Sequence, residues 1–244
     1  MTMEIPQDGK LLVLSPHLDD AVFGCGELIA QFRDATVLTV LAGVPAGFDA
    51  LTPWDAASGF ANAQEAIVLR RREDRAALEV LRASPRWLDF CDSQYRQTPS
   101  PKDIVRALVE SMAQLSPRMV CIPAGLFHSD HELVHEAALS LLQKGDSRIV
   151  SWLMYEEPSY RRVPGLLQRR LADLASRGMR ATPVVVRRHC EMEPVEAAAL
   201  KHEAVHCYAS QLRALEQTVK EAYIDVFSPE RYWLIEPHAG SATE

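Results

Sequence analysis

The sequence predicts an α/β protein, a three-layer Rossmann-like fold in which helices cover both faces of a mostly parallel sheet. Two observations carry this prediction. Short aliphatic runs typical of buried strands alternate with amphipathic segments of about ten or more residues, the pattern of βαβ units. Polar side chains follow directly after several of these runs, where open α/β sheets bind their ligands. No repeat or linker interrupts the alternation, so we expect one domain over residues 1–244, with its core within residues 10–215.

The strands are placed by aliphatic runs that stop at proline, glycine or a polar residue. The first run, Leu11–Leu14, stops at Ser15-Pro16, and the run Arg118–Ile122 stops at Pro123. The other predicted strands, in chain order, are Ala35–Ala42, Arg86–Cys91, Ile149–Tyr155, Thr182–Arg187 and Tyr232–Ile235.

The helices between these strands are placed by alanine and leucine at helical spacing among charged residues. A turn through Gly24 and Gly26 is predicted to lead into the first of them. The predicted helices, in chain order, are Gly26–Arg33, Ala63–Arg82, Lys102–Leu115, Ser129–Gln143, Gly165–Arg177 and Pro194–Leu215. The segment Val44–Phe60 has no period and is predicted to be a loop, either a wall of the substrate site or an irregular connection.

Composition and charge exclude several classes of partner. A formal net charge of −7 and a pI near 5.6 argue against broad binding of nucleic acid or anionic membranes, because both require a basic surface. The segment Met1–Lys10 contains no apolar signal-peptide core, and no later run is long enough to span a bilayer. We therefore expect a cytoplasmic protein without stable membrane insertion. Five scattered cysteines form no C-x-x-C pair and are predicted to be buried small apolar residues: Cys25, Cys91, Cys121, Cys190 and Cys207.

Two clusters of metal-competent side chains follow predicted strands. The first cluster comes just after Leu11–Leu14 and the second just after Arg118–Ile122. Their members are His17, Asp19 and Asp20 in the first, and His128, Asp130, His131 and His135 in the second. The carboxyl ends of parallel strands lie on the same side of a sheet, so the clusters can converge although they are far apart in sequence.

The residue types in these clusters suit a catalytic metal. Histidine and aspartate without thiolates favour zinc or another divalent first-row metal, and a catalytic zinc takes three protein ligands. His17 and Asp20, spaced i, i+3 where a helix begins, can face one point, and His131 is a candidate for the third ligand. Asp19 then points away from its ligating neighbour, and a carboxylate beside the ion is placed to take a proton from water.

At these residues the chain resembles the LmbE/PIG-L family of zinc-dependent N-deacetylases, which remove acetyl groups from N-acetylglucosamine conjugates and related small molecules. Pro16-His17-Leu18-Asp19-Asp20 corresponds to the family's Pro-His-Pro-Asp-Asp motif, and His128-Ser129-Asp130-His131 corresponds to its His-Pro-Asp-His motif. Further matches follow in the expected order: Gly24-Cys25-Gly26, Arg70-Arg71-Arg72-Glu73, Asp92, Lys201, Tyr208 and Ser210-Gln211. The resemblance covers most of residues 10–215.

The resemblance implies a reaction and a set of roles. We expect removal of the N-acetyl group from a small-molecule conjugate that contains N-acetylglucosamine or a related sugar. One Zn²⁺ per chain is implied, with another divalent metal and a homo-oligomer left open. The implied metal ligands are His17, Asp20 and His131, the general base is Asp19, the group that stabilises the oxyanion or protonates the leaving amine is His128, and the substrate contacts are Arg70 and Asp92.

The sequence departs from the family pattern at three positions. Leu18 and Ser129 replace the two motif prolines, and Ala21 replaces a glutamate that usually follows the paired aspartates. None of these changes removes an implied ligand or catalytic group. They therefore bear on the support around the site and on substrate choice more than on metal binding.

Other interpretations of the same residues stay open at this point. The paired aspartates can be turn or N-cap residues, His128 a buried hydrogen-bonded histidine, and Arg70 part of a solvated helix face. The run His131-Glu132-Leu133-Val134-His135 is a literal H-E-x-x-H, which on a helix would make a zinc peptidase with Glu132 as its base. A non-catalytic sugar-binding protein of the same fold is the third alternative.

Overall fold

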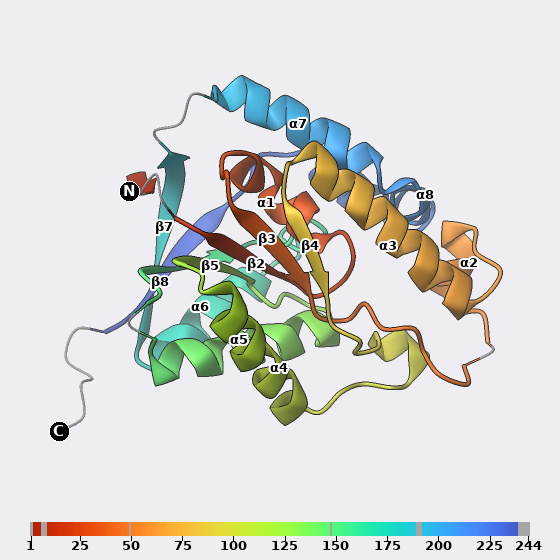
Figure 1. Cartoon of the computed structure of the whole chain (residues 1–244), viewed down its shortest axis with the longest axis horizontal. Helices are drawn as coiled ribbons and strands as arrows, with labels where there is room; N and C mark the ends of the chain where they lie inside the picture. Colours follow the sequence, from red (N-terminus) through yellow and green to blue (C-terminus); the bar gives the residue numbers. More distant parts are fainter. Residues whose placement is uncertain (1, 6–8, 49, 147, 189–191, 239–244) are drawn as a thin grey trace.

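A computed structural model describes residues 2–5, 9–48, 50–146, 148–188 and 192–238 (Figure 1). The strands of these residues form one sheet of eight strands, in the order β1-β7-β8-β6-β5-β2-β3-β4. The pairings are parallel except those of β8, which runs antiparallel to both β6 and β7. The strands are β1 Thr2–Ile5, β2 Leu11–Ser15, β3 Ala35–Thr39, β4 Ser84–Trp87, β5 Met119–Pro123, β6 Ser151–Tyr155, β7 Met179–Arg188 and β8 Tyr232–Pro237.

Helices cover both faces of this sheet, which confirms the predicted three-layer α/β architecture (Figure 1). They are α1 Asp20–Ala30, α2 Pro53–Ser58, α3 Ala63–Val80, α4 Pro101–Leu115, α5 Ser129–Lys144, α6 Leu166–Ser176, α7 Pro194–His206, α8 Ala209–Thr218 and α9 Lys220–Asp225, with a short 3-10 helix, η1, at Ser93–Tyr95.

Strand β2 shows how the layers form. Leu11 and Val13 point into the core shared with α1, α3 and α7, whereas Leu12 and Leu14 point into the core shared with α4, α5 and α6. Successive side chains of a strand face opposite sides of the sheet, so a continuous aliphatic run is what a strand covered on both faces requires. The continuous hydrophobicity of this run is therefore explained by burial on both sides.

The first helix begins earlier than the sequence suggested. The predicted Gly26–Arg33 helix is α1 from Asp20, so the two glycines lie inside the helix and form no turn. A Cβ on Gly24 would come within 2.5 Å of the Tyr155 ring, and one on Gly26 within 2.7 Å of the Lys201 side chain. These glycines therefore permit close packing of α1, a constraint that local sequence does not express.

Other predicted elements needed smaller corrections. The segment Val44–Phe60 contains α2, which is too short for a detectable period and is capped by the side chain of Thr52. The predicted Pro194–Leu215 helix is two helices, α7 and α8, separated at Cys207 and Tyr208. Tyr208 is fully buried and its hydroxyl donates to Asp74, which holds the break in place. Strand β1 and helix α9 were not predicted.

The cysteines are reduced in the described part of the chain. Cys25, Cys91 and Cys121 are buried and Cys207 is half-buried, while Cys190 lies outside the described residues. The prediction of buried small residues is thus confirmed for three of them. None of the described helices combines the length and the apolar character needed to cross a membrane.

Candidate active site and metal centre

The two motif clusters meet at one edge of the sheet. Strand β2 lies between β3 and β5, with Leu11 opposite Ala35 on one side and Met119 on the other. The chain goes from β2 to β3 on one side and later returns to β5 on the other, so the strand order reverses there. Ligands bind at such a switch point in open α/β sheets, and the two motifs follow β2 and β5 directly.

A tight turn after β2 orients the first motif. The buried hydroxyl of Ser15 donates to the carbonyl of His17 at 2.6 Å and accepts the amide of Ala21 at 3.0 Å. The amide of His17 donates to Oδ2 of Asp20 at 2.9 Å. These bonds fold the chain so that the side chains of His17 and Asp20 face the same point at the start of α1.

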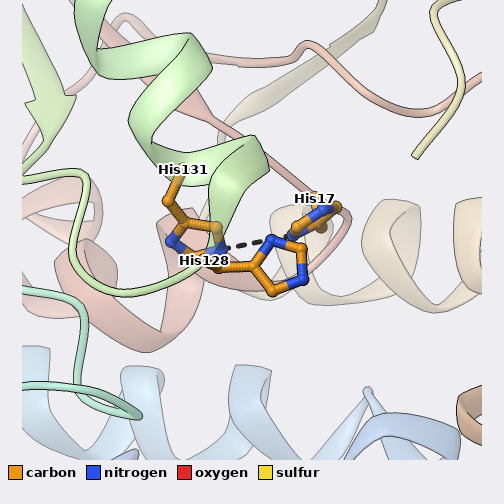
Figure 2. A group of neighbouring side chains, drawn as sticks. All are labelled: His17, His128 and His131. Carbon is orange, nitrogen blue, oxygen red and sulfur yellow. Dashed lines mark hydrogen bonds between the residues drawn. The ribbon is translucent and has the colours of Figure 1, made fainter. Parts of the chain in front are cut away.

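Three donor atoms from the two motifs form a compact triangle. Nδ1 of His17 lies 3.2 Å from Oδ2 of Asp20, and Nε2 of His131 lies 3.3 Å from that same oxygen. The two nitrogens are 3.3 Å apart (Figure 2). His128 lies beside the triangle, because nitrogens of His17, His128 and His131 all fall within 4.8 Å of one another. The structure thus brings the three sequence-predicted metal ligands together.

The triangle has the dimensions of a zinc site. Tetrahedral ligands about 2.0–2.1 Å from a zinc ion are separated from one another by roughly 3.3 Å. Two imidazole lone pairs and a carboxylate oxygen at this separation repel one another unless a cation or protons lie between them. The donor set of two histidines and one carboxylate also suits zinc and the neighbouring divalent metals. The residues present therefore fit the metal that the sequence motifs imply.

The charges around the triangle attract a cation. Burial lowers the pKa of His131, but the Asp20 and Glu157 carboxylates outweigh it and raise that pKa to about 9. Burial is likewise outweighed at His17, whose pKa is raised by carboxylates, with Asp92 the largest contributor. Burial would raise the pKa of Asp20, yet His131 lowers it well below its usual range. The same field favours a divalent cation among these groups.

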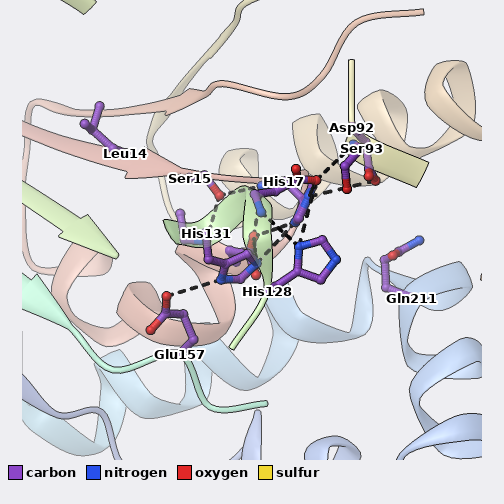
Figure 3. A network of polar contacts seen from close by, with 12 residues as sticks. Leu14, Ser15, His17, Asp92, Ser93, His128, His131, Glu157 and Gln211 are labelled. Atoms are coloured by element: carbon purple, nitrogen blue, oxygen red, sulfur yellow. Dashed lines mark hydrogen bonds and ion pairs between the residues drawn. The ribbon is translucent and has the colours of Figure 1, made fainter. Parts of the chain in front are cut away.

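Each candidate histidine ligand has a carboxylate on its other ring nitrogen (Figure 3). Nε2 of His17 lies 3.0 Å from Oδ2 of Asp130, which also accepts the amide of Ser93. Nδ1 of His131 lies 3.2 Å from Oε1 of Glu157. Such partners fix the tautomer of a ligand and its orientation. Sequence reasoning gave Asp130 no role and missed Glu157, although Glu157 follows β6 at the same edge of the sheet.

Asp19 does not make the hydrogen bond that would identify it as a helix-capping residue. It occupies the N-cap position of α1, but its side chain makes no capping hydrogen bond and instead lines the cavity above the triangle. Burial and the neighbouring Asp20 carboxylate raise its pKa well above the usual range. A carboxylate with this freedom and raised pKa has the properties of a general base.

His128 is placed as an N-cap with one ring nitrogen still available. Its Nδ1 accepts the amide of Asp130 at 3.3 Å, so the neutral ring carries its proton on Nε2. Burial, then the charges of His17 and His131, lower its pKa. The preceding residue, Phe127, has a positive φ of 63°, a strained conformation for a non-glycine residue, and it lines the cavity together with His128.

The two predicted substrate contacts have different surroundings. Arg70 is buried, which excludes the solvated-face alternative, and its Nη2 donates to Asp55 at 2.7 Å while its Nε has no hydrogen-bond partner among the described residues. Asp92 caps η1 and accepts the side-chain amide of Gln94 at 2.6 Å. Both residues line the same cavity as the triangle. Their contact with substrate stays a prediction.

The H-E-x-x-H alternative does not assemble. Nδ1 of the buried His135 donates to the carbonyl of Pro123 at 2.8 Å, and among the described residues His135 belongs to no group whose ligand atoms could hold one metal ion. Burial, followed by Arg170, lowers the pKa of His135 to about 4. Glu132 is exposed and is outside the cavity lining. The two histidines therefore do not share one metal position.

A cavity of about 330 Å³ opens over the triangle. One side of it carries the polar groups described above, including Asp19, Arg70 and His128. Apolar and aromatic residues from α1, α2, α8 and α9 complete the wall, together with Phe127 and Tyr160, whose rings are 5.4 Å apart. The site is therefore a half-enclosed pocket that can hold a small molecule against the metal-competent groups.

Comparisons with known proteins agree with this geometry. Residues 12–142 match the family described as GlcNAc-PI de-N-acetylase, PIG-L. A curated relative, 2′-N-acetylparomamine deacetylase of Streptomyces fradiae, is 30% identical over 172 residues, which are 62% of this chain and 58% of that protein. The chain thus spans less than two thirds of the length of this relative.

Solved structures share the fold over nearly the whole chain. A deacetylase of the teicoplanin biosynthetic pathway is 25% identical, with a TM-score of 0.73 over 95% of this chain and 100% of its own. The 4-carboxy-2-hydroxymuconate hydratase GalB of Pseudomonas putida is 18% identical, with a TM-score of 0.56 over 96% of this chain and 98% of its own. The second likeness concerns the fold alone, since one fold can host several reactions.

Proposed function

The chain belongs to the GlcNAc-PI de-N-acetylase (PIG-L) family, and from this membership we propose that it is a divalent-metal-dependent hydrolase that removes the N-acetyl group from an amino-sugar conjugate. The observation that carries the proposal is the triangle of His17, Asp20 and His131, whose edges of 3.2–3.3 Å match three ligands of one zinc ion. The curated paromamine relative and the teicoplanin-pathway deacetylase support a sugar-containing small-molecule substrate. A cytoplasmic location remains an expectation from the sequence.

A divalent cation at the triangle would polarise the amide carbonyl and lower the pKa of water beside it. Asp19 then takes the proton of the attacking water. Its side chain makes no capping bond, and its raised pKa makes it a stronger base than an ordinary aspartate. Asp20 and the two histidines of the triangle would hold the cation, so Asp19 is the carboxylate of the first motif that is available for proton transfer.

His128 contributes a hydrogen-bond donor on the other side of the reacting carbonyl. Because its Nδ1 accepts the amide of Asp130, its Nε2 hydrogen is available to the oxyanion that develops as water adds. The amine departs with the proton that Asp19 took from the water, or with a proton from His128 once that ring has gained a second one. The lowered pKa of His128 favours the neutral ring, which donates a hydrogen bond from Nε2 to the oxyanion and keeps that proton.

Arg70 and Asp92 hold the sugar in this proposal. Nε of Arg70 is buried and lacks a partner in the described part of the chain, although the same side chain lines the cavity. A buried donor without a partner is costly, and a substrate oxygen would relieve that cost. Asp92 lies beside Gln94 on the adjoining wall and offers acceptor oxygens for hydroxyl groups.

The test is acetate release from a panel of N-acetylated amino sugars. The protein is stripped with a chelator and reloaded with Zn²⁺, Co²⁺ or Fe²⁺, and acetate is measured with each metal. We expect that acetate is released only when metal is bound, and that the rate of release rises with the metal content up to one ion per chain. Absence of acetate release from every N-acetylated sugar, with metal bound, would overturn the proposed reaction and favour the non-catalytic sugar-binding alternative.

A further inference from the structure

Part of the cavity wall is apolar. We name this wall by its five residues, Phe23, Trp54, Leu215, Val219 and Ala222. They come from α1, α2, the end of α8 and α9, so segments far apart in sequence build one surface. Phe23 stands one turn after Asp19 and Asp20 on α1, which places the wall next to the reacting centre.

The polar side chains near this wall are already bonded within the protein. Gln211 accepts the indole hydrogen of Trp54 at 3.0 Å and donates to Ser210 at 2.9 Å. Gln94 accepts the hydroxyl hydrogen of Thr52 at 2.7 Å and donates to Asp92. Figure 3 shows Gln211 on α8, set apart from the group around His17. Few hydrogen-bonding positions are therefore left at this end of the cavity.

Sugar hydroxyls buried on such a wall would lose their bonds to water without replacement, which is unfavourable. An apolar group would instead remove both its own surface and that of the wall from water, which is favourable. On the premise of the proposed N-deacetylase activity, we propose that the substrate is an N-acylated amino sugar bearing an alkyl or aromatic group, and that this group packs on the apolar wall.

A second cavity extends the same surface. It measures about 520 Å³, is lined by Phe48, Leu51 and Pro53 among others, and shares Trp54 and Gln94 with the first cavity. Leu51 is 46% exposed there, so its side chain is accessible to a ligand that enters this cavity. A group longer than the apolar wall can thus continue past Trp54 on further apolar surface.

The apolar group has two chemical sources, and a substrate panel separates them. One arm varies the acyl chain, from N-acetylglucosamine to N-hexanoylglucosamine. The other arm varies the aglycone, from N-acetylglucosamine to its phenyl and hexyl β-glycosides. N,N′-diacetylchitobiose is the polar control of comparable size. We expect kcat/KM to rise roughly tenfold or more in one arm relative to chitobiose, the scale of an apolar group filling a matching pocket.

A matched pair of variants ties the preference to the wall. Val219 is 44% exposed and lines the cavity, whereas Ile224 is 53% exposed on neighbouring α9 and lies outside the lining. Val219→Asp should reduce the ratio of kcat/KM for the preferred apolar substrate to that for chitobiose by roughly tenfold. Ile224→Asp should leave the ratio unchanged, and thermal melting of both variants reports any loss of folding.

The outcomes distinguish this inference from the proposed function. If the metal-loaded protein releases no carboxylic acid from any member of the panel, the proposed N-deacetylase activity is disproved. If N,N′-diacetylchitobiose is hydrolysed at least as efficiently as every apolar substrate, the deacetylase proposal stands but the inference of an apolar substituent is overturned. If the kcat/KM ratio falls equally in Val219→Asp and Ile224→Asp, the preference does not come from the apolar wall, and the inference is also overturned.

Discussion

Oε1 of Glu157 accepts the ring hydrogen of His131 at 3.2 Å and, in addition, the amide hydrogens of Gly125 at 2.7 Å and Leu126 at 3.1 Å. One carboxylate oxygen thus holds a candidate metal ligand and the loop that leads to His128. Its partner Oε2 is buried and has no hydrogen-bond partner among the described residues.

Glu157→Gln should weaken metal binding because the neutral amide gives the His131 ring less negative charge. Loss of such a partner typically costs ~10–100-fold in metal affinity, which competition with a chromophoric chelator measures. Glu156→Gln is the matched control. Glu156 is also buried but accepts from Trp233 at 2.9 Å, away from the triangle. Equal affinities in the two variants would contradict a role for Glu157 in positioning the ligand.

Replacement of any triangle residue should remove the ion. His17→Ala, Asp20→Ala and His131→Ala each leave two donors where a catalytic zinc needs three, so metal content by mass spectrometry should fall far below one ion per chain. His135→Asn should retain the metal, since an asparagine amide can replace the Nδ1 donor to Pro123. Full metal content in His17→Ala and Asp20→Ala would disprove this assignment.

Asp19→Asn and Glu132→Gln separate the deacetylase from the H-E-x-x-H peptidase. Asp19→Asn should keep the metal and lower the rate by ~10²–10⁴-fold, the range for a lost general base. The exposed Glu132 in the first turn of α5 should matter little, with well under ~1 kcal/mol of stability at stake. Amide hydrolysis and metal content decide between them, because the peptidase requires the reverse pattern.

Arg70→Ala should destabilise the protein as well as affect catalysis. The side chains of Arg70 and Asp55 are only 6% and 0% exposed, and removal of one partner leaves a buried charge uncompensated, at a cost of ~3–5 kcal/mol. Arg72→Ala, exposed on the same helix, should change the free energy of unfolding by less than ~0.5 kcal/mol. Denaturant titration compares the two, and similar small losses would refute the buried-pair account.

Substrate binding by Arg70 is therefore better tested by Arg70→Lys. The lysine keeps a positive charge for Asp55 but lacks the Nε donor, so KM should rise with little change in kcat if the contact is uniform between ground and transition states. Steady-state kinetics on the preferred substrate give both constants. Unchanged KM in Arg70→Lys would confine Arg70 to its ion pair with Asp55.

Asp74 should make stability depend on pH. Burial raises its pKa to about 6, against opposing hydrogen bonds from Trp87 and Tyr208. The folded state therefore binds the proton more tightly than the unfolded state. Its contribution is fully present below the unfolded pKa and is lost as pH rises through about 6.

Unfolding at pH 4.5 and 7.5 tests this. The Asp74 contribution to the free energy of unfolding should fall by about 2 kcal/mol between these two pH values. Asp74→Asn should remove that part of the pH dependence. The weaker hydrogen bonds of the amide should lower the free energy of unfolding by the same amount at both pH values. The variant and the unmodified protein having the same pH dependence would show that Asp74 does not titrate in this range.

The sequence alone determined the alternation of strands and helices and the position of both motifs. Continuous aliphatic runs such as Leu11–Leu14 could be interpreted locally, because burial on both faces leaves its mark on every residue of the strand. The convergence of His17 and His131 also followed from sequence. Parallel strands place their carboxyl ends at one edge, however far apart the strands lie in the chain.

Only the tertiary structure decided what surrounds those motifs. Gly24 and Gly26 suggested a turn, but they lie in α1, where Tyr155 and Lys201 pack too closely to leave room for a Cβ. The Glu157 partner of His131 depends on the pairing of β5 with β6, and the apolar wall on the packing of α8 and α9 beside α1. Such contacts are chosen by packing between distant segments, and no local period or motif in the chain records them.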